Sequence, residues 1–358
     1  MHEKSTSPQG EVYKIFSNGV NMNNKNKIIA FALAAMLSLS SCSFPKNEQT
    51  MTDNTENLSS ESSSLPEESV PEIVIEPEPI VEPEPVPEPA VYLSATEVDP
   101  GSYIVIRAEN LDLSDYTFVD FLDYHREFTA MDGGYYCFVP VKTSAKPGSY
   151  TLSFNVDDFS FSETITVNER YAPEQYLVVA PSTLEQTLED AAVRAAFDEF
   201  YQKYRWYNTG VKFWEGEFIK PLGDSWYKET TKFGTFRTFS NGKTEWHNAT
   251  DMGVGGGTPI YATNSGVILF ADYLGLTGNT IIINHGMGVM SWHYHLSKLD
   301  VETGDRVEKG DLIGRVGTTG LSTGNHLHFG ITVGGIFVDP MAMVGSEPNL
   351  EFWKVTEE

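Results

Sequence analysis

Cysteine and basic residues are scarce in this sequence. Its 358 residues include two cysteines, and 24 lysines and arginines stand against 50 aspartates and glutamates, which gives a formal net charge of -26. Binding to the phosphates of a nucleic acid requires clustered lysine and arginine. The composition therefore argues against a nucleic acid as partner. The hydrophobic content of 40% is normal for a globular protein, so a sizeable core can form.

Long hydrophobic runs are also missing. The apolar stretch from Ile28 to Leu39 is too short to span a bilayer comfortably, but it follows two lysines and has the pattern of a signal-peptide core. The next residues lead through two serines to Cys42, and they resemble the lipobox of bacterial lipoproteins, in which the cysteine thiol carries diacylglycerol. An ordinary cleaved signal and an uncleaved anchor helix are the alternatives. All three place the remaining chain outside the cytoplasmic membrane.

Residues 1–42 are thus interpreted as a signal region that ends at Cys42. Residues 1–21 are polar and add nothing that export needs, whereas Met22 begins a conventional lipoprotein signal. We therefore expect Met22 to be the true start. With Cys42 used for lipid attachment, Cys137 is the only thiol of the mature protein, and no internal disulfide can form.

A spacer is expected over residues 43–90. It is rich in serine and asparagine at first and then in repeated Glu-Pro pairs, and this composition cannot bury enough apolar surface to fold. In polyproline conformation its Pro-rich half would reach roughly 80 Å. We interpret it as a disordered, extended stalk, with a protein-binding proline motif as the alternative.

Residues 91–168 predict a small immunoglobulin-like β-sandwich. Short β-type runs at 103–106, 118–121, 135–139, 150–156 and 164–167 alternate with turn residues. The only histidine in this region is His125, which we interpret as a solvated surface residue. The region therefore predicts a positioning or wall-contacting module without chemistry of its own.

A helical connector is expected over residues 169–210. Ser182 and Glu185 have the spacing of a capping box, and apolar residues from Leu184 to Tyr204 recur at helical spacing. The sequence predicts one helix whose apolar stripe docks on a neighbouring domain.

Residues 211–346 predict a compact antiparallel β domain, followed by a tail at 347–358. Glycines at short intervals separate strands such as 266–270, 280–283 and 312–316. Six of the eight histidines lie between His247 and His328. Residues two apart in a strand face the same side, so His326 and His328 can enter one site, and His293 and His295 obey the same geometry. Imidazoles and a carboxylate are ligands of zinc.

The order of motifs in this region resembles the lysostaphin or LytM-like family of zinc endopeptidases, which cut peptidoglycan cross-bridges. The resemblance covers about 130 residues, and its motifs are the His247-to-Asp251 spacing and the segments 257–262, 294–297, 304–310 and 317–328. It implies a mainly β fold: a C-terminal antiparallel metallopeptidase domain with a groove, preceded by the sandwich and the connecting helix.

The resemblance also implies roles for individual residues. It makes His247, Asp251 and His328 the ligands of one Zn²⁺ per domain, and it makes His295 and His326 the catalytic histidines, with the division between acid and base left open. His293 stands where the family has an aromatic residue. It could be a spare ligand, a substrate contact or a plain strand residue, and we favour the last. His285 has no partner in the motifs and is interpreted as structural.

Two functions are consistent with this pattern. The first is a membrane-anchored zinc endopeptidase, tethered through a lipid at Cys42, that hydrolyses peptide cross-links or stems of peptidoglycan by a metal-activated water. The second is a catalytically silent wall-binding lipoprotein that activates another cell-wall hydrolase. The complete ligand set favours the enzyme. Peptidoglycan peptides, and other cell-wall proteins, are the expected partners.

Overall fold

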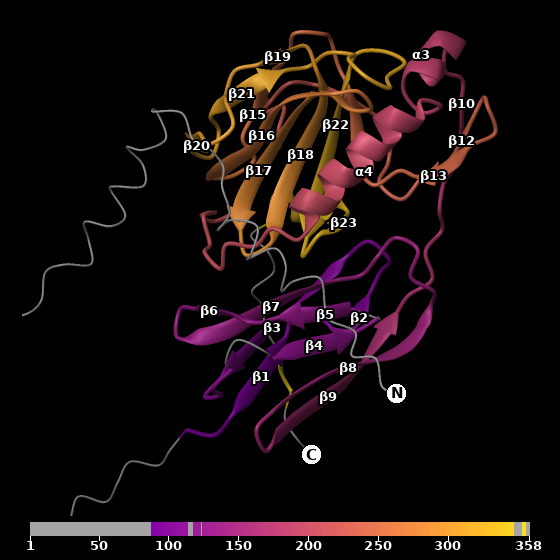
Figure 1. Ribbon diagram of the computed structural model, residues 1–358. Coiled ribbons are helices and arrows are strands. Elements are labelled where there is room, and N and C mark those ends of the chain that lie inside the picture. The colour runs from indigo at the N-terminus through magenta and orange to yellow at the C-terminus, as the bar shows by residue number, and fades with distance from the viewer. Residues whose placement is uncertain (1–86, 114–116, 123, 347–352, 356–358) are drawn as a thin grey trace, which may run out of the picture. The chain divides into compact units, whose positions relative to one another are not determined.

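The computed structural model describes residues 87–113, 117–122, 124–346 and 353–355 (Figure 1). The predicted signal region, the start at Met22, the lipid site at Cys42 and most of the predicted stalk lie outside the described residues, and they stay predictions. Within the described ranges, no helix combines the length and the apolar character that crossing a membrane requires.

Two five-stranded sheets build the N-terminal β domain. Their strand orders are β24-β1-β3-β7-β6 and β2-β9-β8-β4-β5. One apolar cluster draws buried residues from both sheets, among them Leu93 and Ile104 from the first and Leu152 and Ile165 from the second. This shared core is the sandwich arrangement that the strand pattern predicts, and an immunoglobulin-like connectivity stays a prediction. The strands are β1 Ala90–Leu93, β2 Glu97–Val98, β3 Tyr103–Glu109, β4 Phe118–Phe121, β5 Tyr124–Glu127, β6 Thr129–Met131, β7 Gly134–Pro140, β8 Gly148–Val156, β9 Phe159–Val167 and β24 Trp353–Val355.

The last strand of this domain comes from the predicted tail. β24 pairs antiparallel with β1, with Val355 opposite Val91. Cys137 lies on β7 as a buried free thiol, and burial raises its pKa above the ordinary value.

The helical connector is confirmed, but it is divided into two helices where the sequence predicts one continuous helix. β10 Glu174–Leu177 is followed by α3 Pro181–Gln186 and α4 Ala191–Arg205. The predicted cap residue Ser182 lies inside α3, because the helix begins with Pro181 after Ala180 and has no side-chain cap. Asp190 interrupts the helical run: its carboxylate accepts hydrogen bonds from the backbone N–H groups of residues 192 and 193 and starts α4.

An eight-stranded antiparallel sheet forms the centre of the C-terminal domain. Its order is β11-β14-β22-β18-β17-β16-β20, and β23 also pairs with β22. Two small sheets, β15-β21-β19 and β10-β12-β13, accompany it. The elements are β11 Lys228–Thr231, β12 Phe236–Phe239, β13 Thr244–Trp246, β14 Thr250–Gly253, β15 Pro259–Tyr261, β16 Gly266–Leu274, β17 Gly278–Gly286, β18 Val289–Leu296, β19 Lys298–Leu299, β20 Arg306–Val307, β21 Leu312–Arg315, β22 His326–Val333, β23 Ile336–Val338 and α5 Pro340–Met343.

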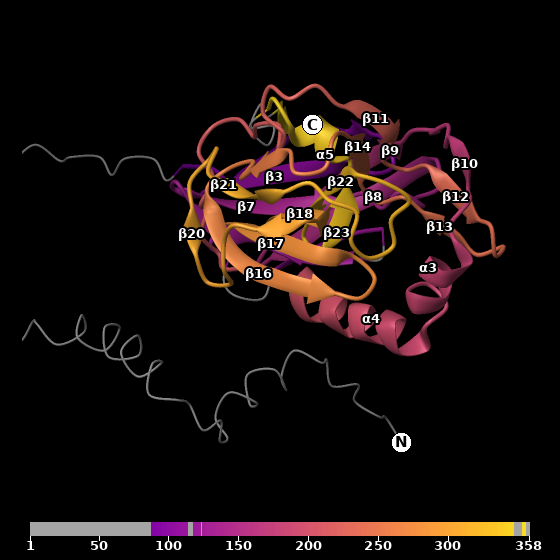
Figure 2. The ribbon, with the colours of Figure 1, turned by 90° about the horizontal axis from the view of Figure 1, so that it is seen from above.

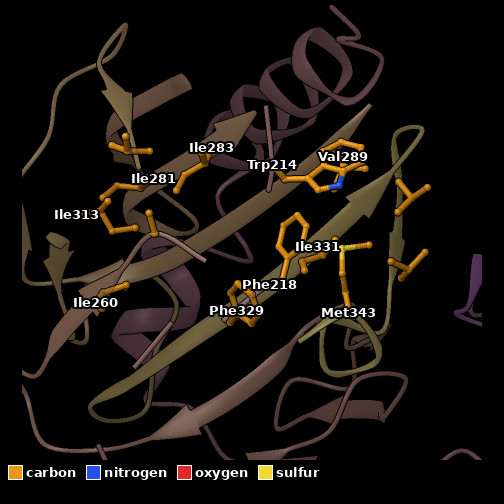
Figure 3. Packing of buried hydrophobic residues seen from close by; sticks show 14 of the residues in the cluster. Trp214, Phe218, Ile260, Ile281, Ile283, Val289, Ile313, Phe329, Ile331 and Met343 are labelled. Atoms are coloured by element: carbon orange, nitrogen blue, oxygen red, sulfur yellow. The ribbon is translucent and has the colours of Figure 1, made fainter. Parts of the chain in front are cut away.

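Both faces of the large sheet are buried. One face packs Ile281, Ile283, Phe329 and Ile331 against residues such as Ile313 from β21 (Figure 3). The alternate residues of β17 and β18 pack against aromatic side chains of α4, which lies across this second face (Figures 1 and 2). Because side chains alternate along a strand, burial on both sides explains the uninterrupted apolar run Ile281–Ile283 in β17.

Candidate metal centre

The three predicted ligands come together from three segments. His247 directly follows β13, Asp251 lies on β14, and His328 lies on β22. β14 and β22 pair antiparallel with Asp251 directly opposite His328. Directly opposed residues point to the same face of a sheet, so the strand register brings the carboxylate and the imidazole side by side.

Their ligand atoms lie within 4.8 Å of one another. The Nε2 atom of His247 is 3.0 Å from Oδ1 of Asp251, and Nδ1 of His328 is 2.9 Å from the same oxygen. The two imidazole nitrogens are 3.1 Å apart. Two nitrogens and one carboxylate oxygen are a donor set that suits Zn²⁺ and leaves a fourth position for water, so the residues present fit this metal.

The backbone fixes which nitrogen of His247 faces the site. Its Nδ1 atom lies 3.1 Å from the carbonyl oxygen of Lys232. Donation of the Nδ1 proton to this carbonyl leaves the lone pair of Nε2 directed at Asp251. A second hydrogen bond of this kind is the usual way in which proteins orient a metal-binding histidine.

His326 and His295, the predicted catalytic histidines, lie beside the three ligands. Nε2 of His326 is 3.7 Å from Oδ1 of Asp251, and the ring centroids of His295 and His326 are 4.8 Å apart. Each ring turns Nδ1 to a backbone carbonyl at 2.8 Å, that of Gly324 for His326 and that of Thr319 for His295. Both rings therefore keep Nε2 free for proton transfer.

A β-bulge sets the position of His295. The register between β17 and β18 shifts between the pairs Ile281–His293 and Asn279–Leu296, so one extra residue enters β18. His295 has a φ of 66°, a conformation that residues other than glycine rarely adopt. Bulges of this kind redirect a side chain next to an active site. The expectation that His293 and His295 share one simple strand geometry is therefore wrong.

His293 lies in the apolar layer of the sheet and not among the ligands. It is fully buried, and its ring packs on Phe329 with the centroids 5.4 Å apart. Burial, and next the neighbouring His285, lower the pKa of His293 to about 3. The arrangement supports the interpretation as a strand residue. His285 is structural as well, since its ring nitrogens contact the carbonyl of Ser265 and the hydroxyl of Ser291.

The electrostatics of the site favour the protonation states that a metal requires. Burial alone would raise the pKa of Asp251, but the imidazoles of His247 and His328 lower it well below its ordinary value. Burial lowers the pKa of His328 to about 4, although the hydrogen bond with Asp251 opposes this. Burial and then the neighbouring His326 lower the pKa of His295 well below its ordinary value. At neutral pH Asp251 is an anion and both rings are neutral.

Two further side chains, to which the sequence analysis assigns no role, complete the surroundings. Arg237 on β12 forms a buried ion pair with Oδ2 of Asp251. Tyr294 stacks in parallel on the ring of His328, with the centroids 4.9 Å apart. A signal for the first was present, because Arg237 shares the inward face of its strand with Phe239. A charged residue at a core position indicates a buried partner of opposite charge.

Comparison with known proteins supports this description. Residues 245–340 match the family model described as Peptidase family M23. The peptidoglycan DD-endopeptidase ShyA of Vibrio cholerae is 38% identical over 109 residues, which are 29% of this chain and 25% of that protein. The DD-carboxypeptidase/endopeptidase Mpg of Neisseria meningitidis is 38% identical over 104 residues, which are 29% of this chain and 24% of that protein. The chain thus spans about a quarter of the length of these curated relatives.

The fold also occurs in a solved structure. A protein described as a putative peptidase M23 from Pseudomonas aeruginosa has a TM-score of 0.50 and 24% sequence identity, and the match covers 69% of this chain and 95% of that one. This likeness concerns the fold. The family match over residues 245–340 includes the three ligands and both flanking histidines. The match to family M23 over residues 245–340 thus agrees with the resemblance to lysostaphin and LytM-like enzymes that the motifs predict.

Proposed function

We propose that this protein is a zinc endopeptidase that hydrolyses peptide cross-links or stems of bacterial peptidoglycan. The observation that carries the proposal is the convergence of His247, Asp251 and His328 on one point, with His295 and His326 beside them. Three ligands with two additional imidazoles form the minimum set for metal-assisted hydrolysis with separate proton carriers.

The residues of the chain have distinct tasks in this mechanism. When bound, zinc supplies Lewis acidity and lowers the pKa of its water toward about 7. Asp251, His247 and the neutral ring of His328 would hold the metal. His295 and His326 present Nε2 lone pairs to the same side, because their Nδ1 protons are held by carbonyl oxygens. One of these rings can take the proton of the attacking water, and one can deliver a proton to the leaving amine.

The choice of substrate rests on the relatives. ShyA and Mpg carry names that describe endopeptidases, and that of ShyA specifies peptidoglycan. Both matches are confined to about a quarter of those proteins, so they support the substrate class through the peptidase domain alone. A wall peptide, bound in a groove along the histidines, is the substrate that we propose.

The test measures zinc content and hydrolysis in the same preparation. We expect the purified protein to hold one zinc per chain and to release soluble muropeptides from purified sacculi. Asp251→Ala removes the oxygen that both ligand histidines contact, so zinc and activity should be lost together. A wild-type protein without zinc would overturn the proposal. A wild-type protein that holds zinc but releases no muropeptide would identify a silent wall-binding relative.

We further propose that the enzyme is exported and held at a bacterial cell membrane by a lipid on Cys42. The lipobox-like residues 39–42 and the acidic, Pro-rich segment after them support this arrangement. Metabolic labelling with a radioactive fatty acid should mark the wild-type protein, and Cys42→Ser should abolish the label. Label that persists in Cys42→Ser would contradict a lipid at this cysteine.

A further inference from the structure

The two oxygens of Asp251 face different partners. Oδ1 lies 3.0 Å from His247 and 2.9 Å from His328 and points to the metal position. Oδ2 is bound by the guanidinium of Arg237. Asp251 is 5% exposed and Arg237 is 9% exposed, so water does not compete for either group. The ion pair is therefore a fixed part of the site and not a loose surface contact.

Arg237 is itself held in place from the connector. β10 runs parallel to β12 with Gln175 beside Arg237 in the register. The Nε atom of Arg237 donates a hydrogen bond of 3.0 Å to the side-chain oxygen of Gln175. The amide nitrogen of Gln175 donates in turn to the hydroxyl of Thr231 at 3.1 Å, and Thr231 lies opposite Asp251 in the pairing of β11 with β14. Hydrogen bonds thus connect Gln175 on β10, through Arg237 on β12, to the candidate metal ligand Asp251.

The connector also reaches the loop that precedes His326. Val179, Leu184 and Leu188 form a small apolar cluster with Phe239, and Leu321 packs against it. Phe239 is two residues from Arg237 on the same strand face, and Leu321 belongs to the turn before β22. α3 and β10 therefore contact the segments that carry both the arginine and a catalytic histidine.

A carboxylate that is free on both sides can bind a metal through one oxygen or through two. Binding through two oxygens would fill the position that a catalytic zinc keeps open for water. The guanidinium on Oδ2 opposes this, because its Nη2 donor already occupies a lone pair of that oxygen and holds it away from the metal position. The arrangement around Asp251 thus has a chemical consequence that goes beyond fixing a rotamer.

The charge of Arg237 does not by itself favour a nearby dication. Across β12 and β13 its register partner is Glu245, a second carboxyl group close to the site. Removal of the guanidinium therefore frees Oδ2 of Asp251 and also makes the field at the metal position more negative, so a readout of the coordination number is needed to separate the two effects.

We infer that Arg237 is a positioning residue that restricts Asp251 to one-oxygen ligation of the metal, and that Gln175 from the connector holds Arg237 for this task. This inference rests on the proposed function. It assigns a role at the metal centre to Gln175 and Arg237, which both precede the family-matched residues 245–340.

The test compares Co²⁺-substituted full-length proteins, because the visible absorption of Co²⁺ is strong in four-coordinate sites and weak when the coordination number rises. Arg237→Met removes every donor. We expect weaker Co²⁺ absorption than in the wild type and digestion slower by roughly 10- to 100-fold, the usual effect of losing a group that supports a ligand. Gln175→Leu should change both quantities in the same direction by a smaller factor, and Arg237→Lys should restore much of the absorption.

A matched control is Arg315→Met. Arg315 pairs with Asp300, a carboxylate away from the ligands, at 3.6 Å, and its loss should leave the Co²⁺ spectrum unchanged. If Arg237→Met does not fold by circular dichroism, Arg237→Gln provides the same comparison with a neutral side chain too short to span both partners. A Co²⁺ spectrum equal to that of the wild type in the folded Arg237 variant would overturn the inference and leave the proposed function intact. A wild-type protein that binds no metal would instead remove the proposed function.

Discussion

The cores of the two β domains differ in what they bury. Within the described residues, the N-terminal sandwich encloses apolar side chains, with Ser94 and Thr117 as its buried polar residues. The C-terminal domain buries four histidines, an aspartate and an arginine: His247, His285, His293, His295, Asp251 and Arg237. Buried ionisable groups are costly unless they are paired, and five of these six have hydrogen-bond partners. The comparison teaches that one domain uses its core for stability and the other uses part of its core for chemistry.

The largest effect is expected from the histidines beside the ligands. His326→Ala removes a proton carrier without removing a ligand, so muropeptide release should fall by roughly 10²- to 10⁴-fold while zinc content stays at the wild-type level. Muropeptide analysis and metal analysis of the same sample check this. Zinc lost in parallel with activity would show that His326 acts as a ligand. The distinction between the ligand histidines and the histidines beside them would then disappear.

A core truncation in the sandwich should have the opposite profile. Leu152 is fully buried between the two N-terminal sheets, and Leu152→Ala should lower the free energy of unfolding by about 2–5 kcal/mol. The hydrolysis rate per folded molecule should stay the same, because no ionisable group of the site contacts this core. Urea unfolding measures the change in the free energy of unfolding, and hydrolysis by the folded protein measures the change in rate. A slower rate in folded Leu152→Ala would mean that the sandwich core also serves the chemistry.

The pH dependence of stability should reflect His285. Burial lowers its pKa from 6.5 to about 4 in the folded protein. As the pH falls from 6.5 toward 4, the unfolded chain binds a proton that the folded protein does not bind, so stability is lost in this window. The contribution between pH 7 and pH 5 is roughly 2 kcal/mol. His285→Gln keeps a polar side chain that does not titrate, and its unfolding free energy should depend less on pH by that amount. If the unfolding free energies of the wild type and of His285→Gln depend equally on pH, His285 is not the source of this pH dependence.

The smallest effect is expected from the exposed histidine of the sandwich. The His125 side chain is 73% exposed and pairs with Asp120, which is 59% exposed. Exposed pairs contribute little, so His125→Ala should change the unfolding free energy by less than about 0.5 kcal/mol and leave hydrolysis unchanged. Thermal unfolding and muropeptide release provide the measurements. A clear loss of activity would assign a function to a surface that the sequence interprets as inert.

The sequence predicts the strands, and it predicts three ligand candidates that the fold brings together, for different reasons. The run 118–121 coincides with β4, because alternation and turn residues mark strands locally. The ligand candidates follow from the motifs, since His247 with Asp251, and His326 with His328, each combine metal-binding side chains within a few residues. Both signals are contained in short segments of chain.

Of the remaining features, one depends on a local helix cap and two depend on contacts between distant segments. The break between α3 and α4 arises because Asp190 caps a new helix, whereas the apolar repeat continues through it. The bulge that turns His295 is a property of the pairing of β17 with β18. Gln175 and Arg237 are separated by 62 residues in the chain and meet because β10 pairs with β12. Periodicity within one segment carries no information about such partners.

The sandwich residues Val105 and Phe138 already pack in the core of the C-terminal domain, and the pairing of β24 with β1 adds a second chain connection between the two domains. In sequence, the chain leaves the sandwich after β9 and returns to it with β24, so the C-terminal β domain is inserted between strands of the sandwich. A second chain connection further restricts any rotation of the two packed domains against each other. Deletion of residues 353–355 would convert this double tether into a single one, and it would leave the edge of β1 free to pair with another chain.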